Sequence, residues 1–119
     1  MAANCIFCKI GAGEIKSDIM DRNDELFVLR DIHPQAPAHL LVIPLEHIAS
    51  IADVPDTNAA FMGRMVAMAN RAARKAGIDK KGYRLVINCR EEGSQTVDHL
   101  HIHVLGGKQM GGNMTGTTS

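Results

Sequence analysis

Three histidines stand at alternate positions in the stretch DHLHIHVLGG, which spans residues 98–107. They are His99, His101 and His103, half of the six histidines in a chain of 119 residues. Successive side chains of a β-strand point to opposite faces, so on a strand these imidazoles share one face and the apolar residues between them share the other. Alternate residues lie roughly 6.6 Å apart, a spacing at which a phosphate group can bridge two imidazoles.

Such a row of imidazoles has three readings. The first is three unconnected structural histidines, and it is the least favoured because neighbouring imidazoles repel each other when charged. The second is a metal site, since two histidines at alternate strand positions can chelate zinc. The third is phosphoryl or nucleotidyl transfer, because histidine is a nucleophile near neutral pH and also gives or accepts protons. In that chemistry the middle imidazole attacks phosphorus and its neighbours hold the oxygens.

The elements that must position this row are predicted to be strands and two helices. ELFVLRDI and AHLLVIPLEHI predict two strands that pair as an antiparallel hairpin across the rigid HPQAP connection, and YRLVINC and HLHIHVLGG predict two more. CIFCKIGAG predicts a short helix that ends at glycine. The stretch from residue 53 to residue 78 predicts one long helix, which begins at Pro55 or Asp56 and is capped by Gly77. This order predicts an α+β fold with an antiparallel sheet of about five strands, one long helix and a short N-terminal helix.

One face of the predicted long helix is apolar. Its residues follow the helical period: Phe61, Met65, Met68, Ala72 and Ala76. We interpret this face as core that covers the sheet, because methionine commonly fills gaps between packed elements. A groove for a partner is the alternative.

Length and charge restrict the class of protein. The chain suits one domain, predicted over residues 1–110, with residues 111–119 as a Gly/Thr-rich tail. Thirteen basic and thirteen acidic residues cancel, which argues against nucleic acid or a membrane surface as partner. No apolar run approaches the roughly 20 residues that cross a bilayer, and the first residues do not form a secretory signal. The odd count of three cysteines then favours the cytoplasm over a disulfide scaffold.

The histidine row and several further motifs resemble the histidine triad (HIT) superfamily. HLHIHVLGG resembles its H-x-H-x-H-x-x motif, in which x is apolar. IFCKIGAGEI, LRDIHPQAPAHLLVIPLEHI, GYRLVINC and LGGKQM resemble the nucleotide-binding branch of the superfamily, often called HINT, in its bacterial form. The resemblance runs from about Cys5 to Met110 and implies a HIT-like fold that forms a homodimer.

The resemblance implies a hydrolase of purine nucleoside phosphoramidates, in which adenosine or guanosine monophosphate is joined through nitrogen to an amine; acyl-nucleotides are further implied substrates. His101 would attack the α-phosphorus, the amine would leave, and water would release the monophosphate from a nucleotidyl-histidine. His103 would contact a phosphate oxygen, and His99 would orient the row through its backbone carbonyl. His47 and Thr96 complete the implied catalytic set, with Thr96 near the leaving group. No cofactor is implied for the chemistry.

The same resemblance implies a nucleotide site. Asp31 would accept hydrogen bonds from the ribose hydroxyls, and Asn88 and Gln95 would lie around the phosphate and ribose. The implied slot for the base is apolar: Ile6, Phe7, Ile10, Leu29 and Ile32. Each has a plainer alternative, since Asp31 can cap a turn, Asn88 can end a strand and the apolar residues can be core. His33 and His39 have no implied role, and we interpret them as structural or surface residues.

A C-x-x-C pair, Cys5 and Cys8, is by itself a weak zinc signal, because zinc needs four ligands. Bacterial relatives that the chain resembles bind zinc through this pair and two histidines, which match His47 and His99. The resemblance therefore implies a structural zinc with the ligands Cys5, Cys8, His47 and His99, placed behind the row so that His101 remains free. Two buried thiols in a helical turn are the alternative.

Two competing functions remain open beside the hydrolase. One is a regulatory protein that binds purine nucleotides and has lost catalysis; the other is a zinc-dependent hydrolase in which the histidine row binds the catalytic metal. The intact triad favours the phosphoramidate hydrolase. Asp98 stands where eukaryotic relatives commonly carry an aromatic residue, and on a strand it is predicted to face away from the triad. The preference for a leaving group is left open.

Overall fold

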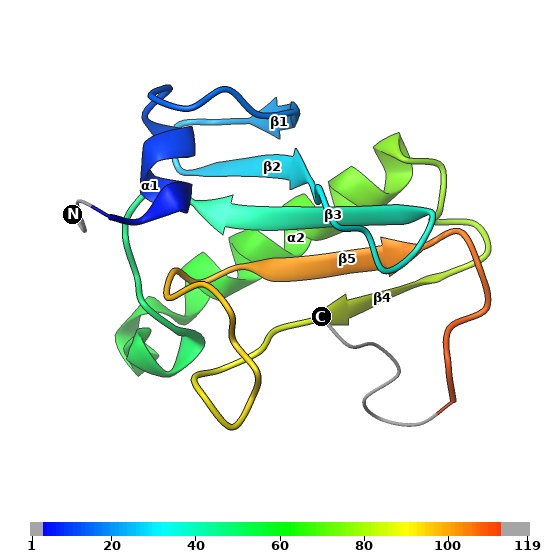
Figure 1. The fold of residues 1–119 in the computed structure, drawn as a ribbon. Helices are drawn as coiled ribbons and strands as arrows, with labels where there is room; N and C mark the ends of the chain where they lie inside the picture. Colours follow the sequence, from blue (N-terminus) through cyan, green and yellow to red (C-terminus); the bar gives the residue numbers. More distant parts are fainter. Residues whose placement is uncertain (1–3, 113–119) are drawn as a thin grey trace.

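The computed structural model describes residues 4–112, and five strands within them form one antiparallel sheet in the order β1-β2-β3-β5-β4 (Figure 1). The predicted tail lies outside the described residues from position 113 onward, as do residues 1–3 of the predicted domain. None of the helices in the described part of the chain is long and apolar enough to cross a membrane. The predicted α+β fold is confirmed.

The elements follow each other along the chain in the predicted order. The first half holds α1 (Ile6–Gly11), β1 (Ile19–Arg22), β2 (Leu26–Arg30) and β3 (Ala38–Pro44). Two single 3-10 turns, η1 (Ile51–Asp53) and η2 (Asp56–Asn58), lead into α2 (Ala59–Lys75), which is followed by β4 (Tyr83–Val86) and β5 (Ile102–Gly106). A long segment of the chain separates β3 from β5, yet these two strands are neighbours in the sheet.

Helix α2 covers one face of the sheet (Figure 1). Its Met65 and Met68 are buried in one cluster with Leu40 and Val42 of β3 and Ile102 of β5. The methionine stripe is therefore core rather than an open groove. The apolar residues that alternate with the histidines lie on this side, as the alternation predicts.

The opposite face of the sheet carries a second cluster and the histidines. Phe7 and Ile10 of α1 pack there with Phe27 of β2 and Leu41 of β3. Leu41 is the register partner of His103 in β5, so the triad lies beside this second cluster. The face of the sheet under α2 is therefore apolar core, and the opposite face carries both α1 and the histidines.

Two predicted boundaries are wrong. Helix α2 begins at Ala59 rather than at Pro55 or Asp56, because Asp56–Asn58 form the separate 3-10 turn η2, which Pro55 precedes. Strand β5 begins only at Ile102. Val42 pairs with Ile102. The next backbone hydrogen bond between β3 and β5 would therefore need the N–H of Pro44, and proline has none to donate. Leu100 instead donates its backbone N–H to the carbonyl of Ile48, at 2.7 Å.

A pair of glycine substitutions tests the local packing of α2 and of the loop before β5. Gly63 lies in the interior of α2 with nothing within 4 Å of an added Cβ, so Gly63→Ala should raise the free energy of unfolding by about 0.5–1 kcal/mol. An added Cβ at Gly93 would lie 2.4 Å from the carbonyl oxygen of Cys89, so Gly93→Ala should lower it by about 1–3 kcal/mol. Urea denaturation of both variants measures the difference, and equal effects of the two would contradict the structure.

Candidate active site

His101 is held as a neutral imidazole with its lone pair on Nε2. Its Nδ1 lies 2.7 Å from the backbone carbonyl oxygen of His99, and since a carbonyl only accepts, Nδ1 donates and Nε2 is unprotonated. The ring is 4% exposed, and burial lowers its pKa below the ordinary value. The neutral form with a free Nε2 lone pair is the nucleophilic form of histidine.

His103 has the opposite tautomer, with its proton on Nε2, and His39 fixes it. The backbone N–H of Gln35 donates to Nδ1 of His39 at 3.0 Å, so the proton of the neutral His39 ring is on Nε2. That nitrogen donates to Nδ1 of His103 at 2.9 Å, which leaves the proton of His103 on its Nε2. Burial is the main cause that lowers the pKa of His103 to about 4, with the neighbouring His101 and His39 adding to it. His103 therefore presents an N–H donor beside His101. The centroids of the two rings are 4.9 Å apart.

His39 is the site residue that the sequence interpretation missed. It is buried rather than a surface residue, and it connects Asp31, whose Oδ2 lies 3.4 Å from Nε2 of His39, to His103. The signal was the alternation in β3: Leu40 faces α2, so His39 must share the other face with the triad. Asp31 also accepts from the backbone N–H of His33 at 2.8 Å, so it caps a turn as well as lying at the end of the triad.

The four side chains that the zinc prediction names lie together at the other end of the row. Nδ1 of His99 is 3.2 Å from Sγ of Cys5 and 3.6 Å from Sγ of Cys8, and Nδ1 of His47 is 3.3 Å from Sγ of Cys8. All four ligand atoms lie within 4.8 Å of one another. Nε2 of His99 donates to the carbonyl of Pro44 at 2.7 Å, which leaves its Nδ1 lone pair toward the thiols.

These distances fit tetrahedral zinc. Bond lengths of about 2.3 Å to sulfur and about 2.05 Å to nitrogen place ligand sulfur and nitrogen roughly 3.5 Å apart around such an ion. A second group, Asp31, His39 and His103, is also close enough for a metal. There, however, the Gln35 N–H fixes the His39 proton on the nitrogen that faces the group, so the group is hydrogen-bonded instead.

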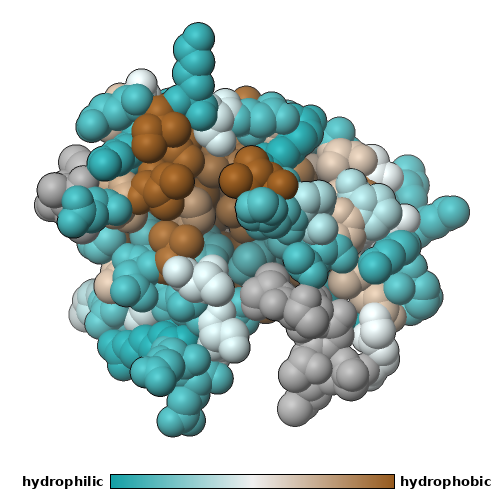
Figure 2. Space-filling model, viewed as in Figure 1, coloured by the Kyte–Doolittle hydropathy of each residue, from teal (hydrophilic) through white to brown (hydrophobic). Residues whose placement is uncertain are grey.

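The residues of the predicted base slot divide by exposure. Phe7, Ile10 and Leu29 are buried, and the Phe7 ring packs edge-on at 5.3 Å, between centroids, against His101. Ile6 is 47% exposed and Ile32 is 80% exposed. Figure 2 shows hydrophobic side chains gathered over α1 and the part of the sheet beside it. The buried residues thus support the triad, and the exposed ones offer apolar surface beside it.

The loop between β4 and β5 carries the remaining predicted residues. The carboxamide of Gln95 is engaged within the protein: its oxygen accepts from the N–H of Arg90 at 2.7 Å, and its nitrogen donates to the carbonyls of Ala49 at 2.7 Å and Val97 at 2.9 Å. Thr96 is exposed, and Asn88 is half-buried just after β4. Gln95 therefore holds the loop that presents Thr96.

Asp98 is not on a strand, as the prediction of its orientation assumed. Residues 97–99 form a bend and not a strand, so alternation does not apply to them. Asp98 lines an open hollow of about 400 Å³ together with Thr96, Ile6 and His47. Two residues that line this hollow contact the buried His99. Sγ of Cys5 lies 3.2 Å from Nδ1 of His99, and the rings of His47 and His99 are 5.0 Å apart between centroids.

Stability should fall in mild acid because His103 is buried as a neutral ring. Its pKa is about 4 when folded and about 6.5 when unfolded, so between these values the unfolded chain binds more protons and the free energy of unfolding decreases as the pH falls. We expect a loss on the order of 2 kcal/mol between pH 7 and pH 4.5. Urea denaturation across this range should show a shallower decrease for His103→Gln and an unchanged one for the exposed control His33→Gln. A His103→Gln slope equal to that of the wild type would contradict this assignment.

The fold and the histidine site agree with one known family. The family model described as the HIT domain matches residues 12–110. The chain is 43% identical over 111 residues, 93% of each chain, to the purine nucleoside phosphoramidase of Escherichia coli K12. Among solved structures, a HIT family hydrolase from Legionella pneumophila superposes with a TM-score of 0.88 at 44% identity and covers 92% of this chain and 97% of its own.

The chain therefore belongs to the HIT domain family, which confirms the family that the motifs predict. A further solved structure bears on the metal: a zinc-bound histidine triad family protein from Mycobacterium smegmatis has a TM-score of 0.74 at 31% identity, over 88% of this chain and 76% of its own. That relative binds zinc. In this chain the cluster of Cys5, Cys8, His47 and His99 fits the same ion.

Proposed function

We propose that the protein is a hydrolase of purine nucleoside phosphoramidates that acts through a covalent nucleotidyl-histidine. The observation that carries the proposal is the pair of opposite tautomers: a lone pair on Nε2 of His101 beside an N–H on Nε2 of His103. A nucleophile and a hydrogen-bond donor side by side suit attack on a phosphoryl group. The identity to a purine nucleoside phosphoramidase over nearly the whole chain supports this substrate class. Adenosine and guanosine derivatives are the purine substrates in the proposal, and acyl-nucleotides are proposed as further substrates.

The reaction runs in two displacements. Nε2 of His101 forms a bond to the α-phosphorus, and the P–N bond breaks with its electron pair going to nitrogen, which takes up a proton and leaves as the amine. The N–H of His103 donates to a non-bridging oxygen while charge develops there, and His39 keeps that N–H in place. Water then attacks phosphorus, the bond to His101 breaks, and the nucleoside monophosphate leaves with the ring restored.

The nucleoside part extends from the triad toward α1 and the end of β2 in this proposal. Asp31 accepts from the ribose hydroxyls, and Asn88 lies near the phosphate. Exposed Ile6 and Ile32 contact the base above the buried Phe7, Ile10 and Leu29. Gln95 acts by holding the loop that places the Thr96 hydroxyl near the leaving group.

We propose a structural zinc held by Cys5, Cys8, His47 and His99. Such an ion ties α1, the segment after β3 and the start of the triad together, and the reaction steps above do not use it. We further propose one domain over residues 1–110 that forms a homodimer in the cytoplasm, with no nucleic acid or membrane partner. Strand β4 is at an edge of the sheet, so its outer side is available to a second copy.

Turnover of adenosine and guanosine phosphoramidates that carry a fluorescent amine tests the function. We expect release of the amine together with stoichiometric adenosine or guanosine monophosphate. Binding of the monophosphates by calorimetry without any turnover would instead support the alternative, a purine-nucleotide-binding regulatory protein with vestigial catalysis.

A further inference from the structure

An open hollow beside Thr96 has no role in the two proposed displacements. Its described lining comes from the start of α1, the segment after β3 and the bend before β5: Asn4, Cys5, Ile6, His47, Thr96, Val97 and Asp98. Its volume of about 400 Å³ is in the range that holds a small organic ligand. The hollow therefore offers room for a group attached to the phosphorus.

The hollow lies at the end of the triad away from the ribose position. Asp31 and His39 are beside His103, whereas Cys5 and His47, which line the hollow, contact His99. A nucleoside whose ribose is held by Asp31 and whose base lies on Ile6 borders the hollow on one side. The other substituent of the phosphorus then extends into the space between Thr96 and Asp98. Asp98 is three residues before His101, so the Cα atoms of these two residues lie within about 11 Å of each other.

Asp98 sets the charge of this hollow. Among the described residues that line it, Asp98 is the only acidic or basic side chain apart from Cys5 and His47, two of the four proposed zinc ligands. A Cys₂His₂ zinc site is neutral, because two thiolates offset the divalent ion. Asp98 is exposed, and no ion pair recorded among the described residues involves it. Its carboxylate is thus available to a cation that enters the hollow.

We propose that this hollow receives the leaving amine and that Asp98 makes the enzyme prefer amines that carry a second, positively charged group. The inference rests on the proposed function and names the substrate class within it. Thr96 provides a hydroxyl near the reacting nitrogen, Val97 contacts the alkyl part, and Asp98 pairs with the distal cation. Asp98 is then a residue that determines specificity and takes no part in bond breaking.

Three adenosine monophosphate phosphoramidates of similar length test the proposal. Their amines are 1,5-diaminopentane, pentylamine and 6-aminohexanoate, which place a cation, a neutral methyl group and an anion at the distal end. We expect kcat/KM to decrease in that order, by about two- to fivefold per step, and the differences to shrink in about 0.5 M salt. Asp98→Asn should abolish the order, and Asp98→Lys should reverse it.

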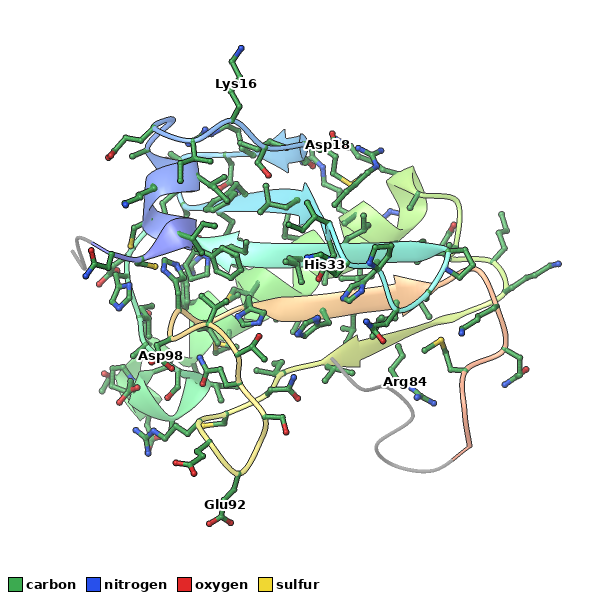
Figure 3. The ribbon with its side chains drawn as sticks, in the orientation of Figure 1. Lys16, Asp18, His33, Arg84, Glu92 and Asp98 are labelled. Carbon is green, nitrogen blue, oxygen red and sulfur yellow. The ribbon has the colours of Figure 1, made fainter. Side chains whose placement is uncertain are left out.

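The matched control is Glu92→Lys, which makes the same change of charge at the tip of the same loop. Figure 3 shows Glu92 at that tip, pointing away from the sheet, while Asp98 lies beside the start of β5. The control should keep the wild-type order. Equal kcat/KM for the three substrates, or an order that Glu92→Lys changes as much as Asp98→Lys, would overturn the role of Asp98. If none of the three substrates is hydrolysed, it is the proposed function that fails.

Discussion

His101→Ala is expected to lower kcat for an adenosine phosphoramidate by about 10³-fold or more, because it removes the atom that forms the covalent intermediate. The fold should survive. The His101 ring is packed edge-on against Phe7, so its loss leaves a small gap that destabilises the protein without unfolding it. Stopped-flow release of a fluorescent amine measures the effect, and circular dichroism checks that the variant is folded.

Two matched variants locate the effect at the nucleophile. His33→Ala removes an exposed histidine that has no part in the proposed reaction and should leave kcat unchanged. His39→Ala leaves the nucleophile in place but removes the donor that fixes the tautomer of His103, so it should lower kcat by about 10-fold to 100-fold. A His101→Ala enzyme that keeps a tenth of the wild-type kcat would be incompatible with nucleophilic attack by this ring.

Removal of zinc is the second large effect, and it should fall on stability rather than on turnover. The purified protein should contain about one zinc per chain, and stripping it with a strong chelator should lower Tm by at least about 8 °C, because the ion binds only the folded state. kcat should change by less than about threefold. The carbonyl that holds His101 is fixed independently, since His99 donates its N–H to Val97 at 2.8 Å and Leu100 donates to Ile48.

Cysteine variants and cobalt distinguish this account from a catalytic metal. Cys8→Ser should lose the metal and the stability while keeping most of the turnover, and Cys89→Ser, at a half-buried cysteine outside the cluster, should change neither. Cobalt-substituted protein should show the visible bands of tetrahedral thiolate coordination. A chelated enzyme that is inactive but still folded would mean that the metal takes part in the reaction, as a zinc-dependent hydrolase requires.

Much of the fold follows from local patterns in the sequence. Alternation placed Leu100, Ile102 and Val104, which follow the three histidines in turn, under α2, because strand geometry leaves them no other face. The glycine end of α2 is confirmed as well, since Gly77 has a φ of 74° that suits only a residue without a side chain. The start of β5 was not predictable from its own residues, because it depends on Pro44 in a distant strand.

The site shows the same division between local and distant causes. The motif indicates the triad, but the role of His39 depends on the pairing of β3 with β5, which brings it against His103 across 64 residues of sequence. His47 was predicted to serve both ends of the site. Its ring lies 5.0 Å from His99, between centroids, and its Nδ1 is beside Cys8, so it belongs to the metal cluster and the hollow.

The stereochemical course at phosphorus is the measurement that tests the covalent mechanism most directly. An adenosine phosphoramidate with a chiral thiophosphoryl centre, hydrolysed in isotopically labelled water, reports whether the configuration is retained or inverted. Two successive in-line displacements, first by His101 and then by water, predict retention. Inversion would show that water attacks phosphorus directly, and the lone pair that the His99 carbonyl keeps on Nε2 of His101 would then not be the nucleophile.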